Sequence, residues 1–307
     1  MKTALLFAGQ ATQYVGMGRH LYDRYPVCRE VFETADAVLS EPLSALIFEG
    51  PEAELNLTRN TQPAVLTVAL AAWALLKERN FAPTVVAGHS LGEYAALVAS
   101  GALRFEDALQ ICRKRGELMQ SAVPEGQGRM IIVQRADVSQ VEDACQSVDG
   151  YCEISVYNAP KLVAVSGETP AVDAVAETLA AQRAIVRSLP VSAPFHCKML
   201  APAAIGLSEV LSPIQISPLQ YPYVNNVDAI WIDEMDPSGI KDNLVRQVVG
   251  AVRWEETIRL FFEKGIERFW HLGPGRSTLT HVKKQNRGAN VMSFDDADAV
   301  TAFMDEN

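Results

Sequence analysis

The chain has 307 residues, of which 49% are hydrophobic and 21% charged, as is usual for a globular protein with a large buried core. Its formal net charge of −10 argues against a general nucleic-acid or membrane-surface binder. No apolar run reaches the roughly 18 residues of a membrane span, and the apolar stretch after Lys2 is too short for a secretory signal. The five cysteines show no metal-binding spacing, so we expect reduced thiols, no metal site and a cytoplasmic location.

The N-terminal part of the chain alternates between strand and helix patterns. Residues 3–8 (TALLFA) predict a buried strand, and residues 61–80 predict a mostly buried helix that Thr61 would cap, with Pro63 in its first turn. Residues 84–88 (TVVAG) are short, β-branched and without polar alternation, which is typical of a buried strand in a parallel sheet. This order of elements predicts an α/β sheet.

The middle of the chain has a different rhythm. Strand and helix patterns follow one another in the order βαββαβ, at 129–134, 138–146, 152–158, 162–167, 170–182 and 184–189. This is the order of a ferredoxin-like unit. We therefore predict an α/β domain formed by residues 1–126 and 197–307, with a ferredoxin-like insertion at 127–196. Residues 252–265 predict an amphipathic helix that Gly265 closes, and the cleft between the two parts is the expected ligand site.

Residues 88–92 read GHSLG, a serine between two glycines at the predicted strand-to-helix turn. GxSxG at such a turn is the nucleophile-elbow arrangement, and side chains at 88 and 92 would clash with the neighbouring strand and helix. The turn raises the Ser90 hydroxyl above the sheet edge and leaves the backbone N–H of Leu91 facing an incoming oxyanion. A serine that merely caps a helix would not need both glycines.

A serine nucleophile needs a base, and the chain has five histidines. His196 lies in the loop SAPFH, where the insertion returns to the large domain, so it is the best candidate. From their positions in the sequence we expect other roles for the remaining four. His89 should point away from the serine, His20 and His281 should be solvated, and His271 should be a structural histidine. No acidic residue is evidently placed to orient His196, so a dyad held by a backbone carbonyl fits as well as a triad.

Arg115 falls on the apolar stripe of the helix predicted at residues 105–122, in line with Ala108 and Cys112. An isolated buried cation is costly, so Arg115 should have a partner. One candidate is an internal carboxylate in a structural ion pair, which the sequence alone favours. The other is a carboxylate on the substrate, which the planar guanidinium would bind through two parallel hydrogen bonds.

A series of segments in fixed order links these residues: LLFAGQATQYVGMG, TQPAVLTVAL, GHSLGEYAALVASGAL, RGELMQ, SVYNAP, LPVSAPFH, VRW and LGPG. Together they closely resemble the malonyl-CoA:acyl carrier protein transacylases and the stand-alone acyltransferases of polyketide synthases. The resemblance extends from the first strand to about residue 285. It implies an α/β-hydrolase-like domain with a ferredoxin-like insertion, in agreement with the rhythm of the elements.

The resemblance also implies a role for each matching residue. Ser90 would carry the acyl group as an ester, and His196 would act as general base and then as general acid. Arg115 would bind the free carboxylate of a malonyl-type unit. The backbone N–H groups of Gln10 and Leu91 would form the oxyanion hole.

Further positions match residues of the substrate site. Gln62 and Asn158 match polar residues whose roles are less defined. Phe195 resembles the bulky residue of malonyl-selective members, which crowds an α-methyl group. In the family, a backbone carbonyl before the VRW helix holds the histidine, and the matching position is Arg253.

The chain departs from the family pattern at several positions. The oxyanion loop usually has the sequence GQGxQ in the family, and in this chain Ala11 replaces the second glycine. Ala193 and Pro194 are unfamiliar before the histidine, and Arg129 stands where small residues are usual. An unusual acyl unit therefore remains open.

The implied reaction is a ping-pong transfer from a coenzyme A thioester, most simply malonyl-CoA, through acyl-Ser90 to the phosphopantetheine thiol of a holo acyl carrier protein. Coenzyme A enters as substrate, with no bound cofactor. The alternative is a hydrolase that strips acyl groups from carrier proteins, but plain acyl chains would not need Arg115. No oligomer signal is evident, and a monomer is the simplest assumption. The pathway, fatty acid or polyketide synthesis, stays open.

A carrier protein is generally acidic, so a protein of net charge −10 needs local basic patches for docking. Residues 283–287 (KKQNR) are one candidate, and Arg113 with Lys114 is another. For each of them, a solvated helix face is the favoured interpretation.

Overall fold

The computed structural model describes residues 1–189, 193–234 and 237–306, and part of the predicted return from the insertion, at 190–192, lies outside these ranges. Within them the larger sheet has six strands in the order β10-β9-β1-β2-β7-β8. Their bounds are β1 Thr3–Phe7, β2 Val85–Gly88, β7 Tyr223–Val224, β8 Trp231–Ile232, β9 Arg268–Leu272 and β10 Asn290–Ser293. The strands β10, β9, β1, β2 and β7 pair in parallel, and β8 is antiparallel to β7. The buried parallel strand predicted at 84–88 is confirmed.

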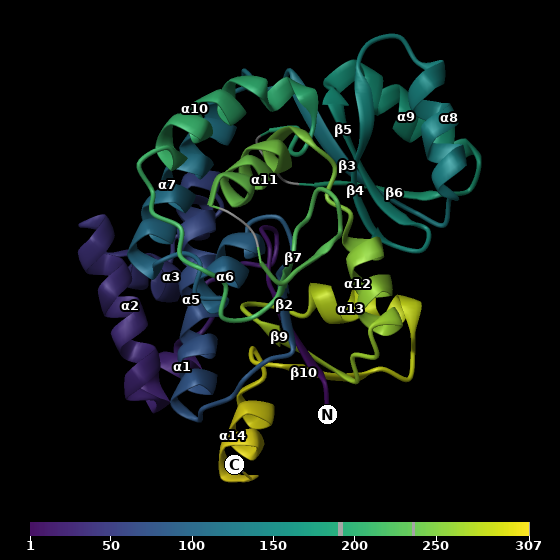
Figure 1. The fold of residues 1–307 in the computed structure, drawn as a ribbon. Coiled ribbons are helices and arrows are strands. Elements are labelled where there is room, and N and C mark those ends of the chain that lie inside the picture. The colour runs from purple at the N-terminus through teal and green to yellow at the C-terminus, as the bar shows by residue number, and fades with distance from the viewer. Residues whose placement is uncertain (190–192, 235–236, 307) are drawn as a thin grey trace.

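Helices cover both sides of this sheet: α1, α2, α3, α5 and α7 lie on one side, and α12 and α13 on the other (Figure 1). The helices outside the small sheet are α1 Arg19–Arg24, α2 Pro26–Leu39, α3 Leu43–Glu49, α4 Glu52–Leu55, α5 Thr58–Glu78, α6 Gly92–Ala99, α7 Phe105–Ser121, the 3-10 turn η1 Lys198–Leu200, α10 Ala201–Leu211, α11 Pro237–Val249, α12 Trp254–Glu263, α13 Ser277–Gln285 and α14 Ala297–Glu306. In the part of the chain that is described, none of them is both long and apolar enough to cross a membrane.

α12 forms as its sequence predicts. Its buried residues, Trp254, Thr257, Ile258 and Phe261, recur at the spacing that places them on one face of a helix. Gly265 follows the helix with φ of 73°, a left-handed conformation that glycine adopts without steric cost. The predicted closure by Gly265 is confirmed.

α5 begins earlier than predicted. It starts at Thr58, so Thr61 is not its cap and Pro63 lies inside the helix. The Thr61 hydroxyl donates to the carbonyl of Leu55 at 2.6 Å, and the added turn packs closely on α7, where a Cβ on Gly116 would lie 2.6 Å from the Cα of Arg59. Tertiary packing therefore outweighs the local cap.

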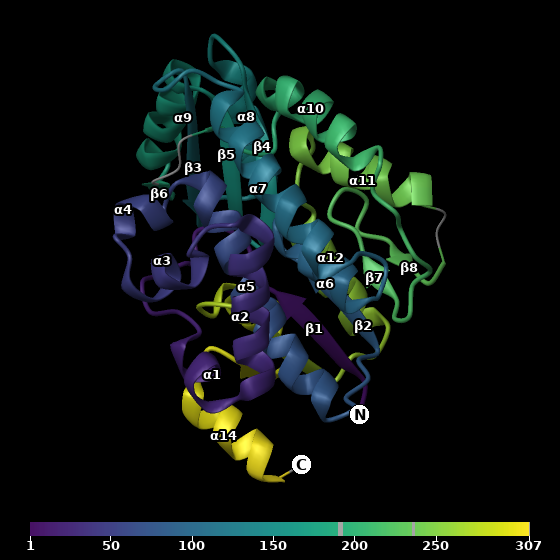
Figure 2. The same ribbon diagram turned by 90° about the vertical axis from the view of Figure 1, so that its left-hand side faces the viewer.

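The second sheet is antiparallel, with the strand order β4-β5-β3-β6. Its elements are β3 Gly128–Gln134, α8 Val138–Ser147, β4 Cys152–Ala159, β5 Leu162–Glu168, α9 Thr169–Ala181 and β6 Ile185–Ser188. The predicted order βαββαβ is confirmed, and so is the α/β fold with a ferredoxin-like second sheet. α8 and α9 cover the face of this sheet that is turned away from the rest of the molecule (Figures 1 and 2). The boundaries 127–196 of the insertion stay a prediction.

Backbone hydrogen bonds join the small sheet to the segment that leads into α12. The N–H of Tyr157 donates to the carbonyl of Val252 at 2.9 Å, and the N–H of Val252 donates to the carbonyl of Ser155 at 3.0 Å. β4 is thereby fixed beside the start of α12, and the space between the two sheets has one wall set by the backbone.

Candidate active site

Ser90 occupies the turn between β2 and α6, with φ of 52° in the left-handed region. The turn is so tight that a Cβ on Gly88 would lie 1.8 Å from the carbonyl carbon of Gly92. A Cβ on Gly92 would lie 2.4 Å from the carbonyl oxygen of Phe7 on the adjacent strand. The predicted steric need for both glycines is therefore confirmed.

Asn226, which follows β7, holds this turn from below. Its Oδ1 accepts a hydrogen bond from the N–H of Ser90 at 2.7 Å, and its Nδ2 donates to the carbonyl of Gly88 at 2.7 Å. One side-chain amide thus satisfies two backbone groups of the elbow. Sequence reasoning missed Asn226, although a polar residue at the carboxyl end of a parallel strand was the signal that could have revealed it.

His196 is buried beside the serine, with its Nε2 2.6 Å from Ser90 Oγ. Its Nδ1 lies 2.8 Å from the backbone carbonyl of Gln247. Because a carbonyl only accepts, Nδ1 carries the proton, and the unprotonated Nε2 accepts from the Ser90 hydroxyl. Burial, and then the charge of Arg115, lower the pKa of His196 to about 3, so the imidazole is neutral at physiological pH.

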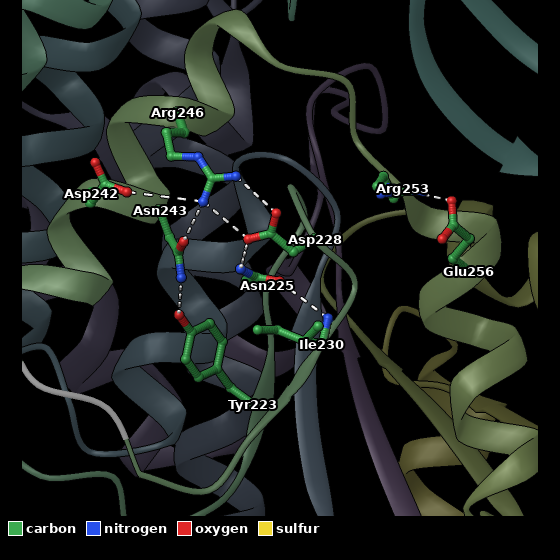
Figure 3. Close-up of polar contacts among 9 residues, drawn as sticks. All are labelled: Tyr223, Asn225, Asp228, Ile230, Asp242, Asn243, Arg246, Arg253 and Glu256. Atoms are coloured by element: carbon green, nitrogen blue, oxygen red, sulfur yellow. Dashed lines mark hydrogen bonds and ion pairs between the residues drawn. The ribbon is translucent and has the colours of Figure 1, made fainter.

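The assignment of Arg253 as the histidine-orienting residue is wrong. Its carbonyl accepts the N–H of Thr257 at 3.1 Å at the start of α12, and its side chain forms an ion pair with Glu256 at 2.8 Å (Figure 3). The orienting carbonyl belongs to Gln247 in the last turn of α11. Carbonyls in the last turn of a helix lack intrahelical partners, so this one is available to His196.

Arg115 is 1% exposed, and its guanidinium meets neutral groups. It donates to Gln62 Oε1 at 2.9 Å and to Gln247 Oε1 at 2.8 Å, and lies 3.4 Å from Ser90 Oγ. The structural ion pair that the sequence alone favoured is wrong: no carboxylate within the described residues lies at ion-pair distance from Arg115. A buried cation with neutral partners beside a nucleophile is suited to a carboxylate from outside.

A cavity of about 260 Å³ opens above these three residues. Its wall on the side of the small sheet includes Met130, Ile132, Val156 and Leu162, and Phe195 lies beside the histidine. Arg129 does not line it, because this side chain forms an ion pair with Asp173. The cavity therefore combines an apolar wall with a polar floor.

The loop after β1 forms another wall of the cavity, through Gly9, Gln10, Ala11 and Thr12. Within the described residues, the backbone N–H groups of Gln10 and Leu91 donate to no acceptor. The predicted oxyanion hole requires this, because both groups must be available to bind an oxyanion. Ala11 has φ of 70°, so this alanine adopts the left-handed conformation that the family's glycine would adopt without strain.

Asn158, His89 and His281 also line the cavity. Asn158 Oδ1 is 2.9 Å from His89 Nε2, and the orientation of His89 away from Ser90 stays a prediction. The solvated position predicted for His281 is wrong: His281 lines the cavity, its Nδ1 is buried without a partner among the described residues, and burial lowers its pKa to about 3. His20 is half-buried, with Nε2 3.1 Å from the carbonyl of Phe294, so it is not simply solvated either.

His271 has the structural role that its position predicted. Its two ring nitrogens lie 2.7 Å from Thr278 Oγ1 and 3.2 Å from the carbonyl of Pro274. In the part of the chain that is described, no group of three or more His, Cys, Asp or Glu side chains could hold a metal ion.

Residues 4–293 match the family of acyl transferase domains. The chain belongs to this family. It is 40% identical over 304 residues to the malonyl CoA-acyl carrier protein transacylase of Bacillus subtilis (strain 168), a match that covers 97% of this chain and 95% of that protein. The enzyme of the same name from Salmonella typhimurium is 39% identical over 288 residues, covering 92% of each chain.

Solved structures of acyl transferases agree. The MCAT structure from Streptococcus pneumoniae is 41% identical, with a TM-score of 0.92 over 100% of both chains. A type II PKS acyl-carrier protein in complex with its malonyl-transacylase gives a TM-score of 0.96 at 36% identity, again over 100% of both chains. The fold predicted from the resemblance is therefore shared along the whole chain.

Proposed function

We propose that this acyltransferase moves a malonyl unit from coenzyme A to the phosphopantetheine thiol of an acyl carrier protein, through an ester on Ser90. One observation carries the proposal: Ser90 Oγ lies 2.6 Å from His196 Nε2 and 3.4 Å from the guanidinium of Arg115. Nucleophile, base and carboxylate-binding cation thus meet around one oxygen. Relatives named malonyl CoA-acyl carrier protein transacylase support the same reaction.

In the first half-reaction, His196 Nε2 takes the proton of the Ser90 hydroxyl while Oγ attacks the thioester carbonyl. The backbone N–H groups of Gln10 and Leu91 stabilise the negative oxygen of the tetrahedral intermediate. The carbon–sulfur bond then breaks, and the coenzyme A sulfur leaves with the proton held by the imidazolium. His196 and Ser90 act as a dyad, because the backbone carbonyl of Gln247 takes the place of an orienting carboxylate.

In the second half-reaction, the carrier-protein thiol gives its proton to His196 and attacks the Ser90 ester. Collapse of the second intermediate returns the proton to Ser90 and releases the acyl carrier protein thioester. Thioester, oxyester and thioester are close enough in energy for the transfer to run without ATP. Water competes with the thiol, and the buried position of Ser90 and His196 restricts its access.

Arg115 selects the acyl unit. A malonyl carboxylate would accept two parallel hydrogen bonds from the guanidinium and bring a negative charge within ion-pair distance of Arg115, where the described residues place no carboxylate. Phe195, 6% exposed in the cavity wall, would crowd a branched unit. The hydrolase alternative is not favoured, because a plain acyl chain would bring no carboxylate to the buried guanidinium of Arg115.

The acidic carrier protein would dock beside α13, in the cytoplasm, with the acyltransferase as a monomer. Ser277 and His281 of α13 line the cavity, and Lys284 lies three residues after His281, on the same face of the helix. The alternative patch is less suited to a partner. Arg113 is already engaged by Glu41 and Asn60, and Lys114 lies 2.9 Å from Glu117.

The test is the intact mass of the protein after incubation with the coenzyme A thioesters of acetate, malonate, methylmalonate and a longer acid. We expect a malonyl adduct that is lost in Ser90→Ala and passes to added holo acyl carrier protein. Free malonate formed faster than loaded carrier protein would instead establish the hydrolase. A matched control is Ser121→Ala, because Ser121 is an exposed serine at the end of α7.

A further inference from the structure

Glu93 is a buried carboxyl that the reaction described above does not use. It lies in the first turn of α6, three residues after Ser90, and is 0% exposed. Its Oε2 accepts hydrogen bonds from Gln247 Nε2 at 2.7 Å and from the backbone N–H of Asn226 at 3.2 Å. Its Oε1 has no partner among the described residues. Burying a carboxyl group with an unbonded oxygen costs free energy, so we expect Glu93 to have a role that offsets this cost.

The first partner, Gln247, contacts Arg115, His196 and the backbone of Ser90. Its Oε1 accepts from Arg115 at 2.8 Å, its Nε2 donates to the carbonyl of Ser90 at 3.0 Å, and its backbone carbonyl orients His196. Arg115 can only donate and a carbonyl can only accept, so the amide has one allowed orientation. Glu93 takes the second hydrogen of Nε2 and fixes this orientation.

The second partner, Asn226, holds the turn that carries Ser90. Glu93 accepts from its backbone, while its side chain bonds the backbone at both Gly88 and Ser90. One carboxylate oxygen therefore links α11 to the loop after β7, directly beneath the nucleophile.

An ion pair ties the same two segments together at the surface (Figure 3). Arg246, the neighbour of Gln247 on α11, bonds both oxygens of Asp228 at 2.8 and 3.1 Å. Asn225, the neighbour of Asn226, donates to Asp228 at 3.1 Å. The outer ion pair positions the segments, and the inner contact at Glu93 positions the groups that face Ser90.

We propose that Glu93 is a positioning residue for acyl transfer: its buried carboxyl holds the Gln247 amide and the Asn226 backbone, and through them Arg115, His196 and Ser90. This inference rests on the proposed malonyl transfer. It separates Glu93 from the catalytic residues, since Glu93 would touch neither substrate nor reacting atoms.

The charge of Glu93 gives this role a measurable signature. Burial raises the pKa of Glu93 to about 7, against the effect of its two hydrogen bonds and of the Arg115 charge from α7. Asp228, from the loop after β7, raises it further, and Tyr223 of β7 and Tyr94 of α6 are the other titratable groups nearby. Glu93 and Arg115 bond the two ends of the Gln247 side-chain amide, so the charge of ionised Glu93 attracts Arg115 without direct contact and competes with a malonyl carboxylate. The KM for malonyl-CoA should therefore rise as the pH increases through about 7.

Three variants test the proposal. Glu93→Gln keeps an oxygen that can accept both hydrogen bonds, whereas Glu93→Met fills the space without an acceptor. Glu256→Gln makes the carboxyl-to-amide change at the surface pair with Arg253 as a matched control. We expect Glu93→Met to lose at least about tenfold in kcat/KM for malonyl-CoA, because it leaves two buried donors unpaired. Acetyl-CoA should lose less, since it does not use Arg115.

We expect Glu93→Gln to retain kcat/KM within about threefold of the unaltered protein at pH 6, a much smaller loss than that of a variant with unpaired buried donors, and to show a KM for malonyl-CoA that no longer varies with pH. A folded Glu93→Met as active as the Glu256→Gln control would overturn the inference, and so would a pH-dependent KM in Glu93→Gln. If Glu93→Met does not fold, the pH profile of Glu93→Gln alone decides. Failure of the unaltered protein to form malonyl-Ser90 would instead refute the proposed function.

Discussion

Replacing Arg115 with methionine should convert the acyltransferase from a malonyl to an acetyl preference. Methionine keeps an unbranched apolar side chain at this buried position but removes the charge and all five donors. A malonyl carboxylate would lose two charge-assisted hydrogen bonds at a site where Arg115 is 1% exposed. Breaking one side of a buried ionic contact costs about 3–5 kcal/mol, which corresponds to a loss of roughly 150- to 5,000-fold in kcat/KM.

Acetyl-CoA brings no carboxylate, so its kcat/KM should change by less than about tenfold, the share expected from Gln62 and Gln247 losing their donor. The assay measures kcat/KM for both thioesters from the mass of loaded carrier protein, with thermal unfolding as a check that the variant is folded. An equal loss for malonyl-CoA and acetyl-CoA would show that Arg115 is structural and refute the reasoning.

Three further predictions concern strain and pH. Gly88→Ala should destabilise the protein by about 3 kcal/mol or more in thermal unfolding, because its Cβ would overlap the backbone of Gly92; unchanged stability would contradict the elbow geometry. Ala11→Gly should raise the free energy of urea unfolding by about 1 kcal/mol, since Ala11 has φ of 70°, and a decrease would argue against a strained loop. The pKa values of His196 and His271 are lowered to about 3 and 4, so below pH 6.5 the unfolded chain binds protons that the folded chain does not. Each of these two histidines should therefore reduce the free energy of unfolding by up to about 1.4 kcal/mol per pH unit as the pH falls. His271→Gln should remove the contribution of His271 to this pH dependence, as measured by urea titrations at a series of pH values.

Much of the fold could be predicted because the decisive interactions are local. The GHSLG turn combines a buried strand, two glycines and a helix within a few residues, and the steric need for Gly88 and Gly92 follows from that spacing. The βαββαβ order was also visible, since each element of the small sheet has its own periodicity. His196 was found because it lies at a junction that the element order defined.

The groups that support the site could not be predicted in the same way. The carbonyl that orients His196 belongs to the backbone of Gln247, and a backbone carbonyl has no residue type to recognise, which is why Arg253 was chosen wrongly. No pattern distinguishes Glu93 within the segment GHSLGEYAALVASGAL, and its partners, Asn226 and Gln247, lie more than a hundred residues further along the chain. Their roles arise from tertiary contact alone.

The backbone contacts between β4 and Val252 limit the size of the acyl unit that the cavity can accept. Separating the two sheets on this side would break hydrogen bonds that join Tyr157 and Ser155 to the segment before α12. The cavity therefore cannot widen there without losing backbone pairing, and Val156 and Asn158, which line it, keep their places. The enzyme would select its acyl unit with a preformed site: a unit binds only if it fits the space between the two sheets.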